Sequence, residues 1–204
     1  MSQTILALLG LTILTTMTMN TKRVVVVIQS NLINEEMEIY GNSLVSQALG
    51  MMESKAFDSR TMPSNVVNFG LPADSSAFST MSTFGNMPVC DPLEPFNDTS
   101  GCDDLDDLHM GNSTWFSYSM PIANNDSMAF EMNIQVVYVS EADPDVEYTG
   151  SNKSNYKKVS IRVRSPYHVQ QGRFTNGFIF MDRIFAYDEE KAVDDAAAWS
   201  AAQP

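Results

Sequence analysis

The chain has 204 residues and a formal net charge of −13, from 25 Asp and Glu against 12 Lys and Arg. Phosphate binding requires clustered cations, so this balance argues against a nucleic-acid partner. The length accommodates one domain of ordinary size together with an additional segment.

The first 28 residues are unusually apolar. Residues 5–19 are mostly aliphatic with several threonines, Lys22 and Arg23 follow, and residues 24–28 read VVVVI. A membrane-spanning helix requires about 20 apolar residues without a central charge pair, whereas a soluble helix carries an apolar stripe on one side. A secretory signal peptide also fits poorly, because no basic residue precedes the segment and no small-residue cleavage motif follows it.

Apolar residues continue at steps of three and four as far as Phe57, and no proline occurs before Pro63. This spacing predicts one helix from about residue 3 to about residue 57, roughly 80 Å long. We therefore divide the chain into a helix over 1–57, with an apolar stalk (1–28) and an amphipathic half (29–57), and a β-rich head over 58–204. Three glycines are expected to weaken the helix: Gly10, Gly41 and Gly50.

The rest of the chain predicts strands rather than helices. Alternation of apolar and polar residues is clearest in YKKVSIRVRS, where Val159, Ile161 and Val163 share one face. Further strands are expected at 128–140 and 177–187, and shorter ones at 65–69 and 115–120. The small, polar tail over 189–204 predicts a frayed end or a short helix. The fold class is therefore α+β with an antiparallel sheet.

Cys90 and Cys102 are the two cysteines of the chain, and the segment between them, DPLEPFNDTSG, is rich in turn-forming residues. Two cysteines that flank one loop favour a disulfide, which implies an oxidising compartment. Two free thiols are the alternative. A zinc site is disfavoured because the sequence offers no further Cys and two His.

In layout this chain resembles the type IV pilin and pseudopilin family. The resemblance depends on three features in chain order. A long helix is apolar at first and amphipathic through NSLVSQALGMMESKAFDSR, and it is followed by a disulfide-stapled loop and an antiparallel sheet. The resemblance implies a helix packed at its C-terminal half on the sheet. It also implies a subunit that waits in the inner membrane, is extruded by a pilus assembly machinery and forms an extracellular helical filament. The residues expected in the filament core are Ile5, Leu6, Leu8, Leu9, Leu11, Ile13, Leu14, Met17, Val24, Val25, Val27 and Ile28.

The sequence departs from this family at its start. The family usually carries Glu at mature position five, where this chain has Ile5, and no acidic residue occurs before Glu35. Either the chain begins at its first mature residue or it belongs to a divergent system. Two other functions stay open: a minor pseudopilin of a type II-like secretion system, and a membrane-anchored envelope protein whose β-domain binds a ligand.

Lys22 and Arg23 require partners if the stalk is buried in a filament, because an unpaired buried charge costs several kcal/mol. Glu35, Glu36 and Glu38 lie about 13 residues further along, or roughly 20 Å along the axis. We expect these acids to pair with the cations of an axially staggered neighbouring subunit. The alternative is that the two cations mark the membrane–water boundary.

No cofactor or catalytic activity is expected. The acidic segment CDDLDDLH raises the possibility of Ca²⁺ bound by Asp103, Asp104, Asp106 and Asp107, although the D-x-[DN]-x-[DN]-G pattern is missing and a solvated acidic turn is the alternative. His109 and His168 are the two histidines, and no nucleophile motif accompanies them.

Overall fold

The computed structural model describes residues 2–81, 84, 90–93, 102, 104–111, 113–121, 127–148, 152–166 and 179–202. The contacts within the chain divide it into two units, Met1–Tyr40 and Gly41–Pro204. Each unit is described by itself below.

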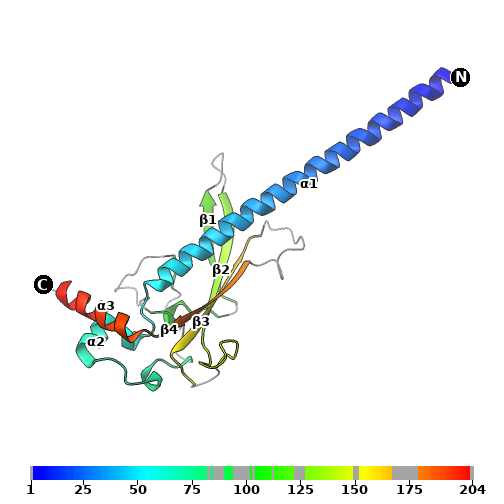
Figure 1. Ribbon diagram of the computed structural model, residues 1–204. Helices are drawn as coiled ribbons and strands as arrows, with labels where there is room; N and C mark the ends of the chain where they lie inside the picture. Colours follow the sequence, from blue (N-terminus) through cyan, green and yellow to red (C-terminus); the bar gives the residue numbers. More distant parts are fainter. Residues whose placement is uncertain are drawn as a thin grey trace. The chain divides into compact units, whose positions relative to one another are not determined.

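Helix α1 (Ser2–Glu53) accounts for the described residues of the first unit and opens the second (Figure 1). This confirms the long N-terminal helix. It ends a few residues earlier than expected, because the chain tightens into turns in which Ser54 N–H donates to Met51 O and Lys55 N–H to Met52 O. The amine of Lys191 donates to the carbonyl of Glu53 at 2.8 Å, which satisfies one of the acceptors that a helix end leaves open.

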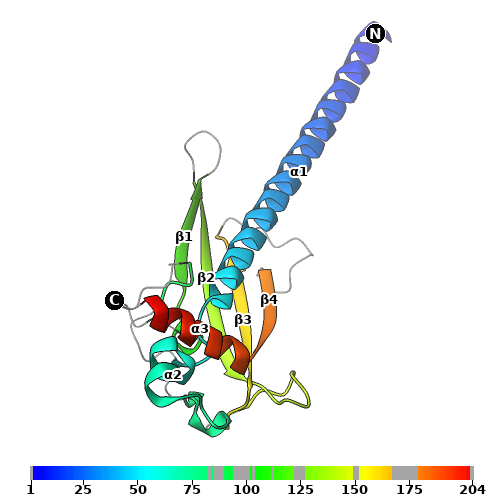
Figure 2. The ribbon, with the colours of Figure 1, turned by 60° about the vertical axis from the view of Figure 1, so that its left-hand side comes forward.

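The second unit is built on a four-stranded antiparallel sheet (Figure 2). Its strands are β1 (Phe116–Pro121), β2 (Ser127–Tyr138), β3 (Tyr156–Arg164) and β4 (Ile179–Ala186), and they lie in sequence order. Each strand pairs with its successor, so the sheet is a simple meander. The predicted α+β class and the antiparallel sheet are confirmed.

The register brings the apolar faces of β2 and β3 together. Ile134 pairs with Ile161 and Val136 with Val159, and all four side chains are fully buried. The last turns of α1 cover this face with a row of buried residues: Leu44, Val45, Ala48, Leu49 and Met52.

The contact between α1 and the sheet is closest at Gly41. A Cβ built on Gly41 would lie 2.1 Å from Cδ1 of Ile179 and 3.8 Å from Cε1 of Phe130. The glycine thus permits close packing of the helix on strands β2 and β4, a role that the sequence pattern did not indicate.

Residues 65–69 form no strand, and that prediction was wrong. They belong to helix α2 (Pro63–Phe69), which begins with a proline at its first position and ends at Gly70, whose φ is +76°. Proline at the start and a left-handed glycine at the end are strong helix signals. They outweigh the strand preference of Val66 and Val67, since the segment is too exposed for β-branched side chains to gain from sheet packing.

The tail forms helix α3 (Glu189–Ala202), which is the short helix that was predicted as the alternative to a frayed end. It packs beside α2 (Figures 1 and 2), and its buried residues are Ala192 and Ala196. Cys90 and Cys102 form the predicted disulfide, with Cα atoms 5.7 Å apart.

Candidate assembly surface

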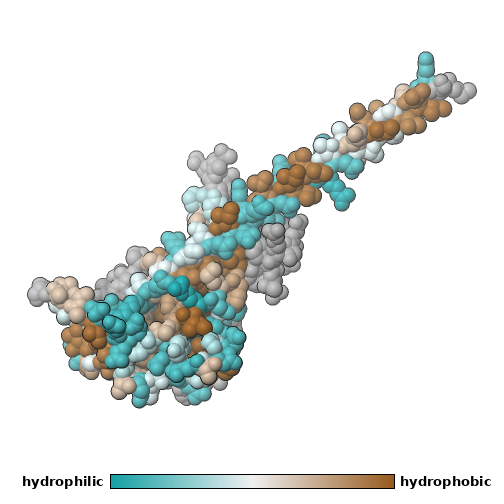
Figure 3. Space-filling view, in the orientation of Figure 1, coloured by the Kyte–Doolittle hydropathy of each residue, from teal (hydrophilic) through white to brown (hydrophobic). Residues whose placement is uncertain are grey.

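The apolar residues between Ile5 and Ile28 lie on the surface of the helix (Figure 3). All twelve residues expected in a filament core are exposed, and the exposed fractions of Val24 and Ile28 are 57% and 53%. Four consecutive valines cover every side of a helix, because successive side chains turn by about 100°. At residues 24–28 the surface is therefore apolar all round, which is typical of a helix enclosed by lipid or by other helices.

By length and composition, the helix over Gln3–Glu53 could cross a membrane, since an 18-residue stretch within it has a mean hydropathy of 1.4. A membrane anchor and a signal sequence both meet this criterion. The structure is thus compatible with membrane contact of the N-terminal segment.

The threonines of this segment bond to their own helix. The hydroxyls of Thr12, Thr16 and Thr21 donate to the carbonyls of Leu9, Thr12 and Met17 at 2.8, 2.9 and 2.8 Å. Each hydroxyl thereby donates its proton to a hydrogen bond without water. Threonine is thus compatible with an apolar environment here, and its small size lets neighbouring helices approach closely.

The charged residues of this unit are also on its surface. Lys22 and Arg23 are exposed, as are Glu35 and Glu36, whereas Glu38 is half-buried. Within residues 2–40 no ion pair joins these cations to these acids, as their separation along one helix requires. The proposed pairing between neighbouring subunits stays a prediction.

The acidic segment after Cys102 is held by its own main chain. Oδ1 of Asp104 accepts hydrogen bonds from the N–H groups of Asp106 and Asp107 at 2.8 and 3.2 Å. Asp106 contacts the amine of Lys157. In the described part of the chain no three Asp, Glu, His or Cys residues come together in a way that could hold a metal ion, and Asp103 lies outside the described residues.

Lys157 is the centre of a buried charge cluster, which we define as Asp58, Asp104, Asp106 and Lys157. The amine contacts Asp106, lies 3.5 Å from Oδ2 of Asp58 and donates to the main-chain carbonyl of Phe57 at 2.5 Å. Lys157 and Asp58 are fully buried. Buried ions require such partners, because the loss of hydration costs several kcal/mol per charge.

Aromatic rings enclose the amine of Lys157. Its Nζ is 4.3 Å from the ring centroid of Phe57, 5.0 Å from that of Tyr138 and 5.3 Å from that of Phe84. The Tyr138 hydroxyl donates to the carbonyl of Ser79 at 3.1 Å. The rings exclude water from the charge cluster and offer their negative faces to the cation.

The surroundings raise the pKa of two carboxyl groups in the charge cluster and lower the pKa of the third. Burial raises the pKa of Asp104 to about 8, with repulsion from Asp106 and Asp107 adding to the effect. Burial also raises the pKa of Asp106, to about 7, against the attraction of Lys157. Burial acts the same way on Asp58, but Lys157 and main-chain N–H donors outweigh it and hold the pKa of Asp58 below its ordinary value.

The charge cluster was missed by sequence reasoning, although one signal was available. Lys157 falls on the same period-two face as Val159, Ile161 and Val163, all of which are buried. A cation in phase with the apolar side of a strand is an exception that calls for a buried partner. Its partners Asp58 and Asp106 could not be named from the sequence, since they are 99 and 51 residues away.

His109 has a structural environment. The N–H of Val136 donates to its Nδ1 at 3.1 Å, and burial lowers the pKa of the imidazole against a main-chain hydrogen bond that raises it. The ring thus ties the segment after Asp106–Leu108 to strand β2. His168 lies outside the described residues.

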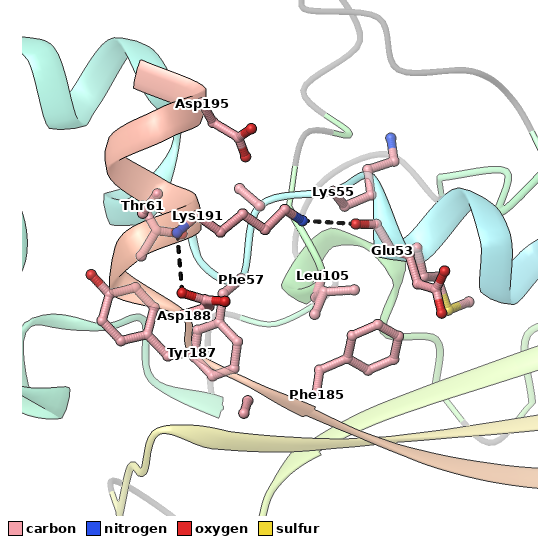
Figure 4. A pocket seen from close by; sticks show the side chains of 14 residues that line it. Glu53, Lys55, Phe57, Thr61, Leu105, Phe185, Tyr187, Asp188, Lys191 and Asp195 are labelled. Atoms are coloured by element: carbon pink, nitrogen blue, oxygen red, sulfur yellow. Dashed lines mark hydrogen bonds between the residues drawn. The ribbon is translucent and has the colours of Figure 1, made fainter. Parts of the chain in front are cut away.

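A small pocket lies beside α3, lined by residues that include Phe57, Leu105 and Phe185 (Figure 4). The main-chain N–H of Lys191 donates to Asp188, and the amine of Lys191 extends along the pocket to Glu53 (Figure 4). These charged groups are engaged in joining α3 to the end of α1.

No protein-family model, curated protein or solved structure matches this chain.

Proposed function

We propose that this protein is the structural subunit of a helical extracellular filament, in which the N-terminal helices bundle into an apolar core. The subunit would lie in the inner membrane before a pilus-type machinery assembles it at the cell surface. Its principal partner would be a second copy of itself, and it would be neither an enzyme nor a nucleic-acid-binding protein. The pilin-like layout of long helix, antiparallel sheet and disulfide supports the proposal.

One observation favours a bundle over a simple anchor: apolar surface continues beyond the cations. The helix from residue 3 to residue 21 is about 28 Å long, close to the roughly 30 Å of a bilayer's hydrocarbon layer. Lys22 and Arg23 would then lie at the membrane surface. Val24, Val26 and Ile28 follow outside it, with exposed fractions of 57%, 62% and 53%.

An anchor leaves those residues facing water, whereas a bundle of staggered helices buries them. At about 25 cal/mol per Å² of apolar surface, burial of one exposed valine contributes on the order of 1 kcal/mol to association. The same stagger would bring Lys22 and Arg23 of one subunit near Glu35, Glu36 or Glu38 of another. A contact of this head-to-tail kind does not close on itself and so generates a filament.

The proposed subunit uses no cofactor. The calcium hypothesis would need Asp104 and Asp106, and both already have protein partners: main-chain N–H groups for Asp104 and Lys157 for Asp106. A hydrogen-bonded acidic turn accounts for the run of aspartates in this segment without a metal ion.

The proposal is tested with one substitution placed at two sites. Val26→Asn changes the apolar segment beyond the cations, and Val146→Asn makes the same change at an exposed valine of the head, 49% exposed. We expect Val26→Asn to reduce the yield of fibres in sheared surface material, and Val146→Asn to leave it unchanged. Negative-stain microscopy with mass spectrometry of the fibres provides the measurement.

Equal fibre yield from the two variants would contradict the proposed bundle. Absence of fibres containing the wild-type protein, with the chain recovered as a detergent-solubilised monomer, would favour the membrane-anchored binding protein. Recovery of the chain at low copy in a secretion complex would favour the minor pseudopilin.

A further inference from the structure

Lys157 and Asp106 place an amine and a carboxyl group in direct contact inside the head. Lys157 is fully buried and Asp106 is 4% exposed. The second oxygen of Asp106, Oδ2, is buried and receives no hydrogen bond from the described residues. A carboxylate that forms a stable ion pair normally has both oxygens satisfied, because an unpaired buried charge is costly.

The surroundings of this pair exclude water and raise the pKa of its carboxyl group. The aromatic rings of Phe57, Phe84 and Tyr138 surround the amine, and burial raises the pKa of Asp106 to about 7. Transfer of one proton from the amine of Lys157 to Asp106 converts the ion pair into a neutral amine and a neutral carboxylic acid. These are the reactive forms for amide formation.

A second acid stands beside the pair. Asp104 is 3% exposed, and its Oδ1 accepts the N–H of Asp106 at 2.8 Å. Burial raises the pKa of Asp104 to about 8, so this carboxyl group carries a proton at neutral pH. Asp104 can therefore donate a proton to a leaving oxygen, and it can accept one from a nitrogen once it has done so.

We propose that Lys157 and Asp106 condense into an amide that crosslinks the head covalently. Nζ of the neutral amine attacks Cγ of Asp106, and a C–N bond forms. One C–O bond of Asp106 then breaks, and its hydroxyl leaves with a proton from Asp104 as water. Asp104 recovers its proton from the nitrogen. One ammonium and one carboxylate are thereby converted into one amide and one water, without change of net charge and without an oxidant.

The fold favours this reaction by holding the two groups in contact and by excluding water. Holding the two groups in contact replaces an encounter in solution, and such proximity reaches effective concentrations of about 10⁵–10⁸ M. Exclusion of water also disfavours the reverse hydrolysis. The amide would join strand β3 to the 3-10 turn Asp106–Leu108, four residues after the disulfide at Cys102.

The crosslink is tested by the intact mass of the purified full-length protein in denaturing solvent, which does not depend on whether a variant folds. After allowance for the disulfide, we expect the wild type to be lighter than its sequence by one water molecule. Fragment spectra of a chymotryptic digest should show the peptide that contains Lys157 joined to the peptide that contains Asp106.

Two matched variants locate the reaction. Lys157→Arg removes the nucleophile and should restore the full mass. Lys158→Arg changes the next residue, which pairs with Glu147 on the other face of β3, and should keep the loss of water. Asp104→Asn should slow the formation of the crosslink by roughly a hundredfold or more, as expected for loss of a general acid.

A wild-type protein of full sequence mass would overturn the proposal. So would a loss of water that persists in Lys157→Arg, since it would then arise from another reaction. Equal rates of crosslinking in Asp104→Asn and the wild type would overturn the role assigned to Asp104. None of these outcomes depends on filament formation.

Discussion

Asp104 should make the stability of the head depend on pH in a direction opposite to that of an ordinary paired carboxylate. Burial, with repulsion from Asp106 and Asp107, raises its pKa from 3.8 to about 8. The unfolded chain releases this proton near pH 4, and the folded head retains it until about pH 8. Between these values the folded state holds one more proton, so the free energy of unfolding falls as the pH rises.

The magnitude follows from the width of this window. Each pH unit over which the two states differ by one proton changes the free energy of unfolding by about 1.4 kcal/mol. A window of about four units therefore corresponds to a loss of about 6 kcal/mol as an upper bound. The contribution is fully present below pH 4 and fully lost above pH 8. Asp58, whose pKa is lowered, adds a separate loss of stability in stronger acid.

The substitution Asp104→Asn separates charge from geometry. The amide stays neutral at every pH, and its oxygen can still accept the N–H groups of Asp106 and Asp107, which are 2.8 and 3.2 Å from Oδ1 in the wild type. The two proteins are compared as chains of full sequence mass, in which Lys157 and Asp106 are not crosslinked, and we expect similar stability at pH 5. At pH 9 we expect the variant to be more stable by several kcal/mol, up to the bound of about 6 kcal/mol.

Denaturant unfolding of the full-length chain in detergent, followed by near-ultraviolet circular dichroism at a series of pH values, provides the measurement. Asp194→Asn, at an exposed position of α3, serves as the control and should follow the wild type. Parallel pH profiles for Asp104→Asn and the wild type would refute the reasoning, because they would mean that Asp104 ionises alike in both states.

Two further predictions concern helix α1. Charge reversal in Arg23→Glu should abolish fibres and leave the near-ultraviolet spectrum of the head unchanged. The double variant Arg23→Glu/Glu36→Arg exchanges the two charges and should restore part of the fibre yield. Normal fibres from the single variant would exclude the pairing. Gly50→Ala should raise the free energy of unfolding by about 0.5–1 kcal/mol, since nothing lies within 4 Å of the added Cβ. Gly41→Ala should give no gain, because Ile179 must move; equal gains at both glycines would show that this contact is unimportant.

Much of the fold could be predicted from the sequence, where a local pattern and the final environment agree. The alternation of Val159, Ile161 and Val163 with polar residues corresponds to the buried and less buried sides of β3. The long helix follows from apolar spacing and from the absence of proline. These elements were predictable because a strand or a helix places side chains on one face at a fixed spacing, and that spacing is visible in the sequence.

Prediction was wrong where two local signals compete. Val66 and Val67 favour a strand, whereas Pro63 and Gly70 mark the two ends of a short helix. The ends decided the outcome, since a seven-residue segment gains little from β-branched residues without a neighbouring strand.

The sequence by itself determined that this protein has a long apolar rod, a β-rich head and a disulfide within it. Those features depend on periodicity, proline placement and two cysteines, all of which are local. The tertiary structure decided that Asp58, Asp106 and Lys157 meet in one buried place. No local pattern encodes that meeting, because the chemistry of a buried charge depends on which distant groups the fold brings to it.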